Sequence, residues 1–436
     1  MARNWETKRE WRTAGAGTLV ILGLIVLLML MPTGAGPAHE RSAAGLPMAS
    51  GGLGTHTDVI VARNFPAGPD ATPACLPSQL CPSLLLAGYS MTGLIASSGF
   101  NGTKQVIGIF DACGDPTLVA DLKAFDTAWS LKAPPALGII KPDGSTCTSS
   151  GWAIETALDV EWAHVMAPGA AIDLFETATT STSDFYSAWN YAHNHTAAHV
   201  FSNSWGAGAE CSTGLNDEAA WLSSHGNTVL AATGDSGSWG YSTGIASQQP
   251  ADCPQVTAVG GTTFNVSGTG VYHDESAWHG SGGGYATWAE PSWQKNVHIS
   301  DPGGSAYTGK PDVSADANPS TGVLVYEAGG WLLVGGTSLA TPLWAGFLTD
   351  VNSWRVNFLG YPLLGQVNPF LYQDVYGAFG HEFDYLHGAM HDIKGGNNSH
   401  SSGGPWSASV GWDPATGIGS FSGLNLDYVL ANDITA

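Results

Sequence analysis

The stretch Gly335-Gly336-Thr337-Ser338-Leu339-Ala340-Thr341-Pro342-Leu343-Trp344 carries the strongest structural signal in the chain. Apolar residues at 331–334 predict a buried strand before it, and the apolar run to 351 predicts a helix that tolerates a proline near its start. Ser338 is therefore expected at a strand-to-helix turn. Glycines allow a tight turn and close approach of a substrate, and the free N–H groups of a helix start favour developing negative charge. A nucleophile fits this place, although Gly-Thr-Ser also serves as an ordinary helix cap.

Alternating strand and helix patterns fill the chain before this turn. We expect strands at 105–110, 136–140, 171–176, 199–205, 228–233 and 255–259, and helices at 118–129, 152–165, 185–197 and 216–224. Repeated βα units of this kind predict an α/β fold with a doubly wound, mainly parallel sheet and helices on both faces. Active residues are then expected on loops beyond the carboxyl ends of the strands.

The composition limits the classes of function. Of 436 residues, 43% are hydrophobic and 11% are charged, which predicts a packed core in one large domain. The formal net charge of -22 at pH 7 makes nucleic acid and anionic membrane surfaces poor partners. Once the carboxylates are protonated, only 14 Lys and Arg and 14 His remain as positive charges, so acid causes limited self-repulsion. Such a chain suits a low-pH habitat.

The N-terminus indicates export from the cytoplasm. Basic residues up to Arg12 precede an apolar segment at 18–31, and small residues at 34–38 suit a cleavage site. We expect residues 1–38 to be a signal peptide or an uncleaved membrane anchor, residues 39–87 to be a linker rich in Gly, Ala, Pro and Ser, and residues 88–436 to be the folded domain. The protein would then be extracellular, either secreted or tethered to the outer face of the cell membrane.

The cysteines support the same compartment. Six cysteines form an even set without the CxxC spacing of metal sites, so disulfides are the expected use. We expect pairing in chain order, Cys75 with Cys81, Cys113 with Cys147 and Cys211 with Cys253, although fifteen connectivities are open to six cysteines.

Two acidic residues interrupt the apolar face of the helix expected at 152–165. Glu155 and Asp159 are four positions apart and lie on one face. Like charges at this spacing destabilise a helix and burial raises a carboxyl pKa, so a buried pair would share a proton and act as a general base in acid. The alternative is that both side chains face water.

A third acid, Asp235, follows the apolar strand expected at 228–233 and is bracketed by glycines. It is either an ordinary turn aspartate or a protonated carboxyl that donates a hydrogen bond to an oxyanion.

Taken in chain order, these segments resemble the sedolisin family of serine-carboxyl peptidases, which have a subtilisin-like fold. The resemblance covers about 88 to the C-terminus and rests on Glu155-Thr156-Ala157-Leu158-Asp159, Ala167-Pro168-Gly169-Ala170, Ser202-Asn203-Ser204-Trp205-Gly206, Gly234-Asp235-Ser236-Gly237, Val259-Gly260-Gly261-Thr262, Ser281-Gly282-Gly283-Gly284, Pro311-Asp312-Val313-Ser314-Ala315-Asp316 and Gly336-Thr337-Ser338. It implies an acid-active endopeptidase with Ser338 as nucleophile, Glu155 as general base and later acid, Asp159 as its proton-sharing partner and Asp235 as oxyanion donor.

The resemblance also implies how substrate and metal are bound. A polypeptide substrate would pair with the edge formed by Ser204, Trp205 and Gly206, opposite a wall formed by Ser281, Gly282 and Gly283. One structural Ca²⁺ would be held by the side chains of Asp392 and Asp413 and by the carbonyl groups of Ile393, Ser409 and Gly411, since a hard cation prefers oxygen ligands. We expect a monomer.

The resemblance leaves rival interpretations open. The span before residue 88 is too short for the large folded propeptide that is usual in the family. A catalytically silent peptide-binding protein is the non-enzymatic alternative. A histidine-dependent subtilisin-like peptidase lacks a suitable histidine segment here, and a glycosidase would need paired acids but no Gly-Thr-Ser turn.

Overall fold

The computed structural model of the chain describes residues 54–65, 72–96, 100–144, 146–238, 248–297, 307–376, 388–399 and 406–432. All of them belong to one compact unit, Met48–Ala436. The signal or anchor expected at 1–38 lies outside these ranges. Within the described ranges, no helix has both the length and the apolar character needed to span a bilayer.

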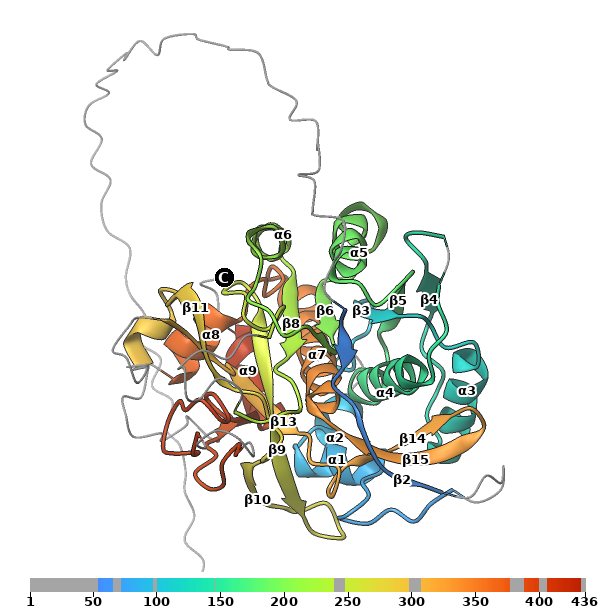
Figure 1. Cartoon of the computed structure of the whole chain (residues 1–436). Helices are drawn as coiled ribbons and strands as arrows, with labels where there is room; N and C mark the ends of the chain where they lie inside the picture. The colour runs from blue at the N-terminus through green and yellow to red at the C-terminus, as the bar shows by residue number, and fades with distance from the viewer. Residues whose placement is uncertain are drawn as a thin grey trace, which may run out of the picture. The chain divides into compact units, whose positions relative to one another are not determined.

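The centre of this unit is a sheet of eight strands (Figure 1). Seven follow one another in the order β10-β9-β8-β6-β3-β5-β4, and β13 pairs with β9. Their bounds are β3 Val106–Ala112, β4 Leu137–Ile140, β5 Ala171–Thr177, β6 Val200–Asn203, β8 Thr228–Ala232, β9 Thr257–Val266, β10 Tyr272–Ala277 and β13 Val313–Asp316. Every pair is parallel except β10 with β9. The expectation of an α/β fold with a mainly parallel sheet is confirmed.

Helices cover both faces of this sheet, as expected. Their bounds are α1 Pro82–Gly88, α2 Thr92–Ala96, α3 Leu118–Trp129, α4 Ser150–Met166, α5 Thr182–His195, α6 Thr213–Ser224, α7 Thr337–Trp354, α8 Asn368–Phe370 and α9 Gly423–Asn432. Strand β3 shows how the two cores are separated, because its side chains alternate between the faces. Ile107 and Ile109 pack into a core with α3, α4 and α7, whereas Phe110 and Ala112 pack into a core with α5 and α6.

The strand before Ser338 belongs to a different sheet from the one that the alternating pattern predicts. Strand β15, Gly330–Gly335, pairs antiparallel with β14, Val323–Glu327, and with β2, Ile60–Asn64. A buried apolar run indicates a strand but carries no information about which strand lies beside it.

The stretch expected to be a linker is structured where it is described. Strand β1, His56–Thr57, pairs with β7, Trp205–Gly206, and β2 continues the β15 sheet. All five side chains of β2 are exposed, so the strand is held by backbone pairing and its sequence shows no apolar period. Helix α1 begins within the same stretch, directly after Cys81.

Three disulfides connect the cysteines in chain order, Cys75 with Cys81, Cys113 with Cys147 and Cys211 with Cys253. The expected pairing is confirmed.

Candidate active site

Ser338 lies at the start of α7, at the strand-to-helix turn that the sequence predicts. Strand β15 ends at Gly335, Gly336 is the N-cap with a φ of 118°, and the helix begins at Thr337. A φ in this region favours glycine, and a Cβ at Gly336 would also collide with Asp235 Oδ2 and with the backbone carbonyl of Asp58. The turn therefore brings three segments together around the buried Ser338 side chain.

Glu155 and Asp159 reach this point from α4, which packs against α7 in the same core. Both carboxyl groups are fully buried, which excludes the alternative that they face water. Ser204 Oγ donates to Asp159 Oδ1 at 2.8 Å and also lies 3.4 Å from the carbonyl oxygen of Ser338. Ser204 thus connects the acid on α4 to the serine on α7.

Burial dominates the electrostatics of this pair. The pKa of Glu155 is raised well above its ordinary value, mainly by burial and then by the charges of Asp159 and Asp111, while the neighbouring Ser338 hydroxyl lowers it. The pKa of Asp159 is also raised, by burial and by Asp111, against the hydrogen bond from Ser204. Two buried carboxyls that repel each other hold a shared proton more tightly than an exposed carboxyl does.

Asp235 approaches from the loop after β8, which ends at Ala232. Its Oδ1 accepts hydrogen bonds from the Thr337 backbone at 2.7 Å and from Thr337 Oγ1 at 3.0 Å. Its Oδ2 is buried without a hydrogen-bond partner among the described residues. Burial, and next the charge of Asp58, raise the pKa of Asp235, so its free oxygen carries a proton in acid and faces the turn at Gly336 as a donor.

Two acids of the site were missed by the sequence analysis. Asp111 lies at the end of β3, and burial, followed by the charge of Glu176 and offset by Thr156, raises its pKa to about 7. Asp111 directly follows the apolar run at 106–110, and a similar apolar run before Asp235 made that residue a candidate. Asp58 lies between β1 and β2 and is 2% exposed, in a stretch whose composition gives no such signal.

The two predicted substrate walls lie in different environments. The edge formed by Trp205 and Gly206 pairs antiparallel with His56 and Thr57 of the same chain. Ser281, Gly282 and Gly283 are buried behind the Asp235 loop, where the backbone of Gly282 donates to the carbonyl of Gly234 at 2.7 Å.

A cavity of about 550 Å³ adjoins Asp235 and is lined by Ile60, Ser236, Trp278, His279, Gly280 and Ser399 as well. The three residues directly before Ser281 therefore form its wall. This cavity therefore lies beside the loop that carries Asp235.

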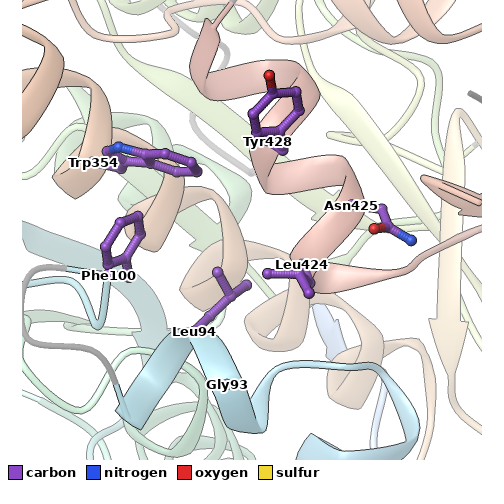
Figure 2. Close-up of a pocket in the computed structure, with 7 residues that line it drawn as sticks. All are labelled: Gly93, Leu94, Phe100, Trp354, Leu424, Asn425 and Tyr428. Carbon is purple, nitrogen blue, oxygen red and sulfur yellow. The ribbon is translucent and has the colours of Figure 1, made fainter. Parts of the chain in front are cut away.

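A second cavity, of about 350 Å³, lies at the opposite end of α7 (Figure 2). The rings of Phe100, Trp354 and Tyr428 surround it together with Leu94 and Leu424. Ser338 and Trp354 are at opposite ends of a helix that rises about 1.5 Å per residue, so about 24 Å separates them. The apolar cavity is therefore separate from the carboxyl cluster.

The predicted calcium ligands lie on two segments near the C-terminus that contact each other. Asp392 Oδ1 accepts from the Gly411 backbone at 3.1 Å, and Asp413 Oδ2 accepts from the Ser409 backbone at 2.9 Å. Among the described residues, no cluster of three or more His, Cys, Asp or Glu side chains could hold a metal ion. Both carboxyl groups accept hydrogen bonds from the backbone at 409–411, and the calcium site stays a prediction.

Comparisons with known proteins identify relatives over most of the chain. Residues 150–358 match the family model described as the Subtilase family. Kumamolisin of Bacillus sp. (strain MN-32) is 33% identical over 354 residues, which cover 75% of this chain and 60% of that protein. Sedolisin of Pseudomonas sp. (strain 101) is 30% identical over 373 residues, covering 77% and 60%. The chain thus spans about 60% of the length of these curated relatives.

A solved structure supports the fold over most of the chain. Pseudomonas sedolisin, described as a serine-carboxyl proteinase complexed with two molecules of pseudo-iodotyrostatin, superposes with a TM-score of 0.67 and 25% sequence identity. The match covers 83% of this chain and 100% of that one. The subtilisin-like fold expected from the sequence is confirmed.

Proposed function

The chain belongs to the sedolisin family, and we propose that it is a serine-carboxyl endopeptidase that hydrolyses polypeptides through an acyl-enzyme. The observation that carries this proposal is the fully buried pair of Glu155 and Asp159, brought by α4 against the helix start that presents Ser338. Burying two carboxyl groups costs folding free energy. A general base beside a nucleophile gives this burial a catalytic use.

In the first half of the reaction, Ser338 Oγ attacks the substrate carbonyl carbon while Glu155 takes the hydroxyl proton. Asp159 holds part of the shared proton and is itself positioned by Ser204 at 2.8 Å. Glu155 then returns the proton to the leaving nitrogen as the C–N bond breaks. Water then attacks the resulting ester while Glu155 takes a proton from it, and Glu155 returns this proton to Ser338 Oγ as the ester bond breaks.

Asp235 and the backbone N–H of Ser338 would stabilise the negative oxygen of the tetrahedral intermediate. The free Oδ2 of Asp235 can donate only when it is protonated. Its raised pKa keeps that proton in acid, and the donor is lost as the pH rises through this pKa. Glu155 must in turn lose its proton to act as a base, so activity should peak in acid and fall on both sides.

We further propose one structural Ca²⁺ at Asp392, Ile393, Ser409, Gly411 and Asp413, and action of a monomer outside the cytoplasm. Two carboxylates that both accept hydrogen bonds from the backbone at 409–411 support the ion, because a hard cation prefers oxygen ligands. Three disulfides support an oxidising compartment.

The test is cleavage of a denatured protein by the purified chain from pH 2 to 8, with Ser338→Ala as the control. Cleavage that peaks in acid and disappears in Ser338→Ala supports the proposal. A folded wild-type protein that cleaves nothing at any pH with Ca²⁺ present would favour the silent peptide-binding alternative.

A further inference from the structure

An aromatic cage lies at the end of α7 that is far from Ser338. The rings of Phe100, Trp354 and Tyr428 surround the cavity of about 350 Å³ (Figure 2). The ring centroids of Phe100 and Trp354 are 4.5 Å apart at an interplanar angle of 68°, and those of Trp354 and Tyr428 are 6.4 Å apart at 53°. Rings inclined in this way form walls around a space instead of filling it as a stack. The Tyr428 side chain is exposed, so the cavity can be reached from solvent.

The walls of this cage suit an organic cation. The face of an aromatic ring attracts positive charge, and several rings around one space are the usual site for a quaternary ammonium group. The other residues that line the cavity are Gly93, Leu94, Leu424 and Asn425, so none of its described lining residues is Lys or Arg. The protein thus supplies the rings without supplying a cation to fill them.

Two aromatic contacts fix how α7 lies against the C-terminal helix. Phe347 stacks on Phe421 with ring centroids 4.9 Å apart, and Trp354 contacts Tyr428. The contacts advance by the same number of residues on both segments, from 347 to 354 and from 421 to 428. The middle of this interface, directly behind the cage, therefore brings Asp350 of α7 opposite the first turns of α9.

A buried carboxyl pair occupies this middle position. Asp350 is 1% exposed and Asp427 of α9 is not exposed at all, and none of their four carboxyl oxygens has a hydrogen-bond partner among the described residues. Burying such groups without partners costs folding free energy. Trp354 lies one turn after Asp350 on α7, and Tyr428 directly follows Asp427 on α9. A cation between the rings would therefore lie close to both carboxyl groups.

Few charged groups compete for this pair. Helix α2, which carries Leu94 into the cage, has no titratable residue. Arg355 follows α7, and its Nε and Nη1 donate to the carbonyl oxygens of Pro362 and Leu430 at 2.8 and 2.7 Å. Burial raises the pKa of Asp427 to about 8 and also raises that of Asp350, to which the charge of Asp427 adds. The pair therefore holds protons at neutral pH that a cation in the cage would displace.

We propose that the cage binds a quaternary ammonium group, with Phe100, Trp354 and Tyr428 against its methyl groups and with Asp350 and Asp427 supplying negative charge behind the rings. The formal net charge of -22 raises the concentration of cations near the protein. The site lies apart from Ser338 and goes beyond the proposed function. Its chemistry is shared by a free choline-like molecule and by the choline headgroup of a lipid.

Calorimetric titration of the full chain with choline tests the cage. The matched ligand is the neutral carbon analogue of choline, in which a carbon atom replaces the nitrogen and the shape is unchanged. We expect saturable binding of choline with a Kd of about 1 mM or below, and binding of the analogue that is weaker by about 10-fold or more. Titration at pH 7 in buffers of different ionisation enthalpy should show that choline binding releases protons.

Variants assign the parts of the site. Trp354→Leu keeps an apolar side chain and should weaken choline binding by about 10-fold or more with little effect on the neutral analogue. Tyr428→Leu, at an exposed position on α9, should act in the same direction and remains informative if the first variant does not fold. Trp221→Leu, which removes an exposed tryptophan from α6, is the matched control and should bind choline normally. Asp427→Asn should weaken choline binding at pH 7 by about 10-fold and remove the proton release.

Vesicles of phosphatidylcholine distinguish the two sources of the group. Cosedimentation that free choline reverses would support the site and assign it to a lipid headgroup, whereas choline binding without cosedimentation would support it and assign it to a free ligand.

Three results would overturn the proposal. Equal affinity for choline and its neutral analogue would show an apolar cavity and refute the cation. Unchanged choline binding in Asp427→Asn would refute the role of the carboxyl pair. Folded wild-type protein without saturable choline binding below about 10 mM would refute the site itself. None of these results changes the expected Ser338-dependent cleavage, so the proposed function stands or falls separately.

Discussion

Replacing Asp235 tests whether a protonated carboxyl stabilises the oxyanion. In Asp235→Asn the amide oxygen can still accept from the Thr337 backbone, as Oδ1 does at 2.7 Å, while the amide nitrogen takes the place of the unpartnered Oδ2. This nitrogen donates at every pH. Asp235→Ala removes both the donor and the acceptor.

The two variants should differ in the size of their effect on kcat. Loss of one oxyanion donor costs about 100- to 1,000-fold in kcat, or roughly 3–4 kcal/mol, so Asp235→Ala should fall by that amount at its optimum. In the wild type, the protonated fraction of Asp235 falls about tenfold for each pH unit above its raised pKa, and activity should fall with it. Asp235→Asn should retain activity within roughly tenfold of wild type at the optimum and lose this alkaline decline.

The assay is kcat and KM from pH 2 to 8 on one peptide substrate, with circular dichroism to show that each variant is folded. The matched pair shares the same position, so a packing defect alone would lower both variants without moving the pH profile. An Asp235→Asn profile that declines at the same pH as wild type would refute the assignment of the alkaline limb to this residue. Full activity in Asp235→Ala would refute its role as a donor.

Three further predictions concern the base, the core and the loop at the C-terminus. Asp159→Asn keeps an acceptor for Ser204 but cannot share a proton, so kcat should fall by about 100-fold or more with KM little changed, as steady-state kinetics will show. Asp427 is buried without a hydrogen-bond partner among the described residues, and burial raises its pKa to about 8. The folded state therefore holds a proton that the unfolded state releases above about pH 4. In denaturant titrations, Asp427→Asn should stabilise the protein by roughly 2–4 kcal/mol at pH 7 and little at pH 4. A chelator should lower the Tm of the wild type, and Asp413→Ala should abolish both the response to the chelator and its reversal by Ca²⁺.

The parts of the site that the sequence could predict are those with a local pattern. Glu155 and Asp159 follow the helical spacing that places them on one face, and both are buried on α4. Ser338 and Asp235 each lie three residues beyond the end of an apolar strand, in the turns that the sequence predicts. Such features depend on a few neighbouring residues, so composition and spacing are sufficient to locate them.

The parts of the fold and of the site that the sequence could not predict depend on pairing between distant segments. Nothing in the exposed strand β2 indicates that it pairs with β15, more than 260 residues later in the chain. The same pairing places Asp58 beside Ser338, which the composition of a Gly- and Ala-rich stretch does not suggest. Backbone pairing stabilises such a strand without an apolar period. Because its sequence lacks that period, it has the pattern expected of a linker.

The acid activity proposed for this protein and its expected stability in acid would have one physical cause. Glu155, Asp159 and Asp58 are buried and Asp235 is half-buried, and burial is the largest cause of each raised pKa. A carboxyl whose pKa is raised on folding contributes its full stability below about pH 4 and loses it as the pH rises through the folded value. Ionisation of Asp235 above its raised pKa also removes the oxyanion donor, so stability should begin to fall at a lower pH than catalysis does.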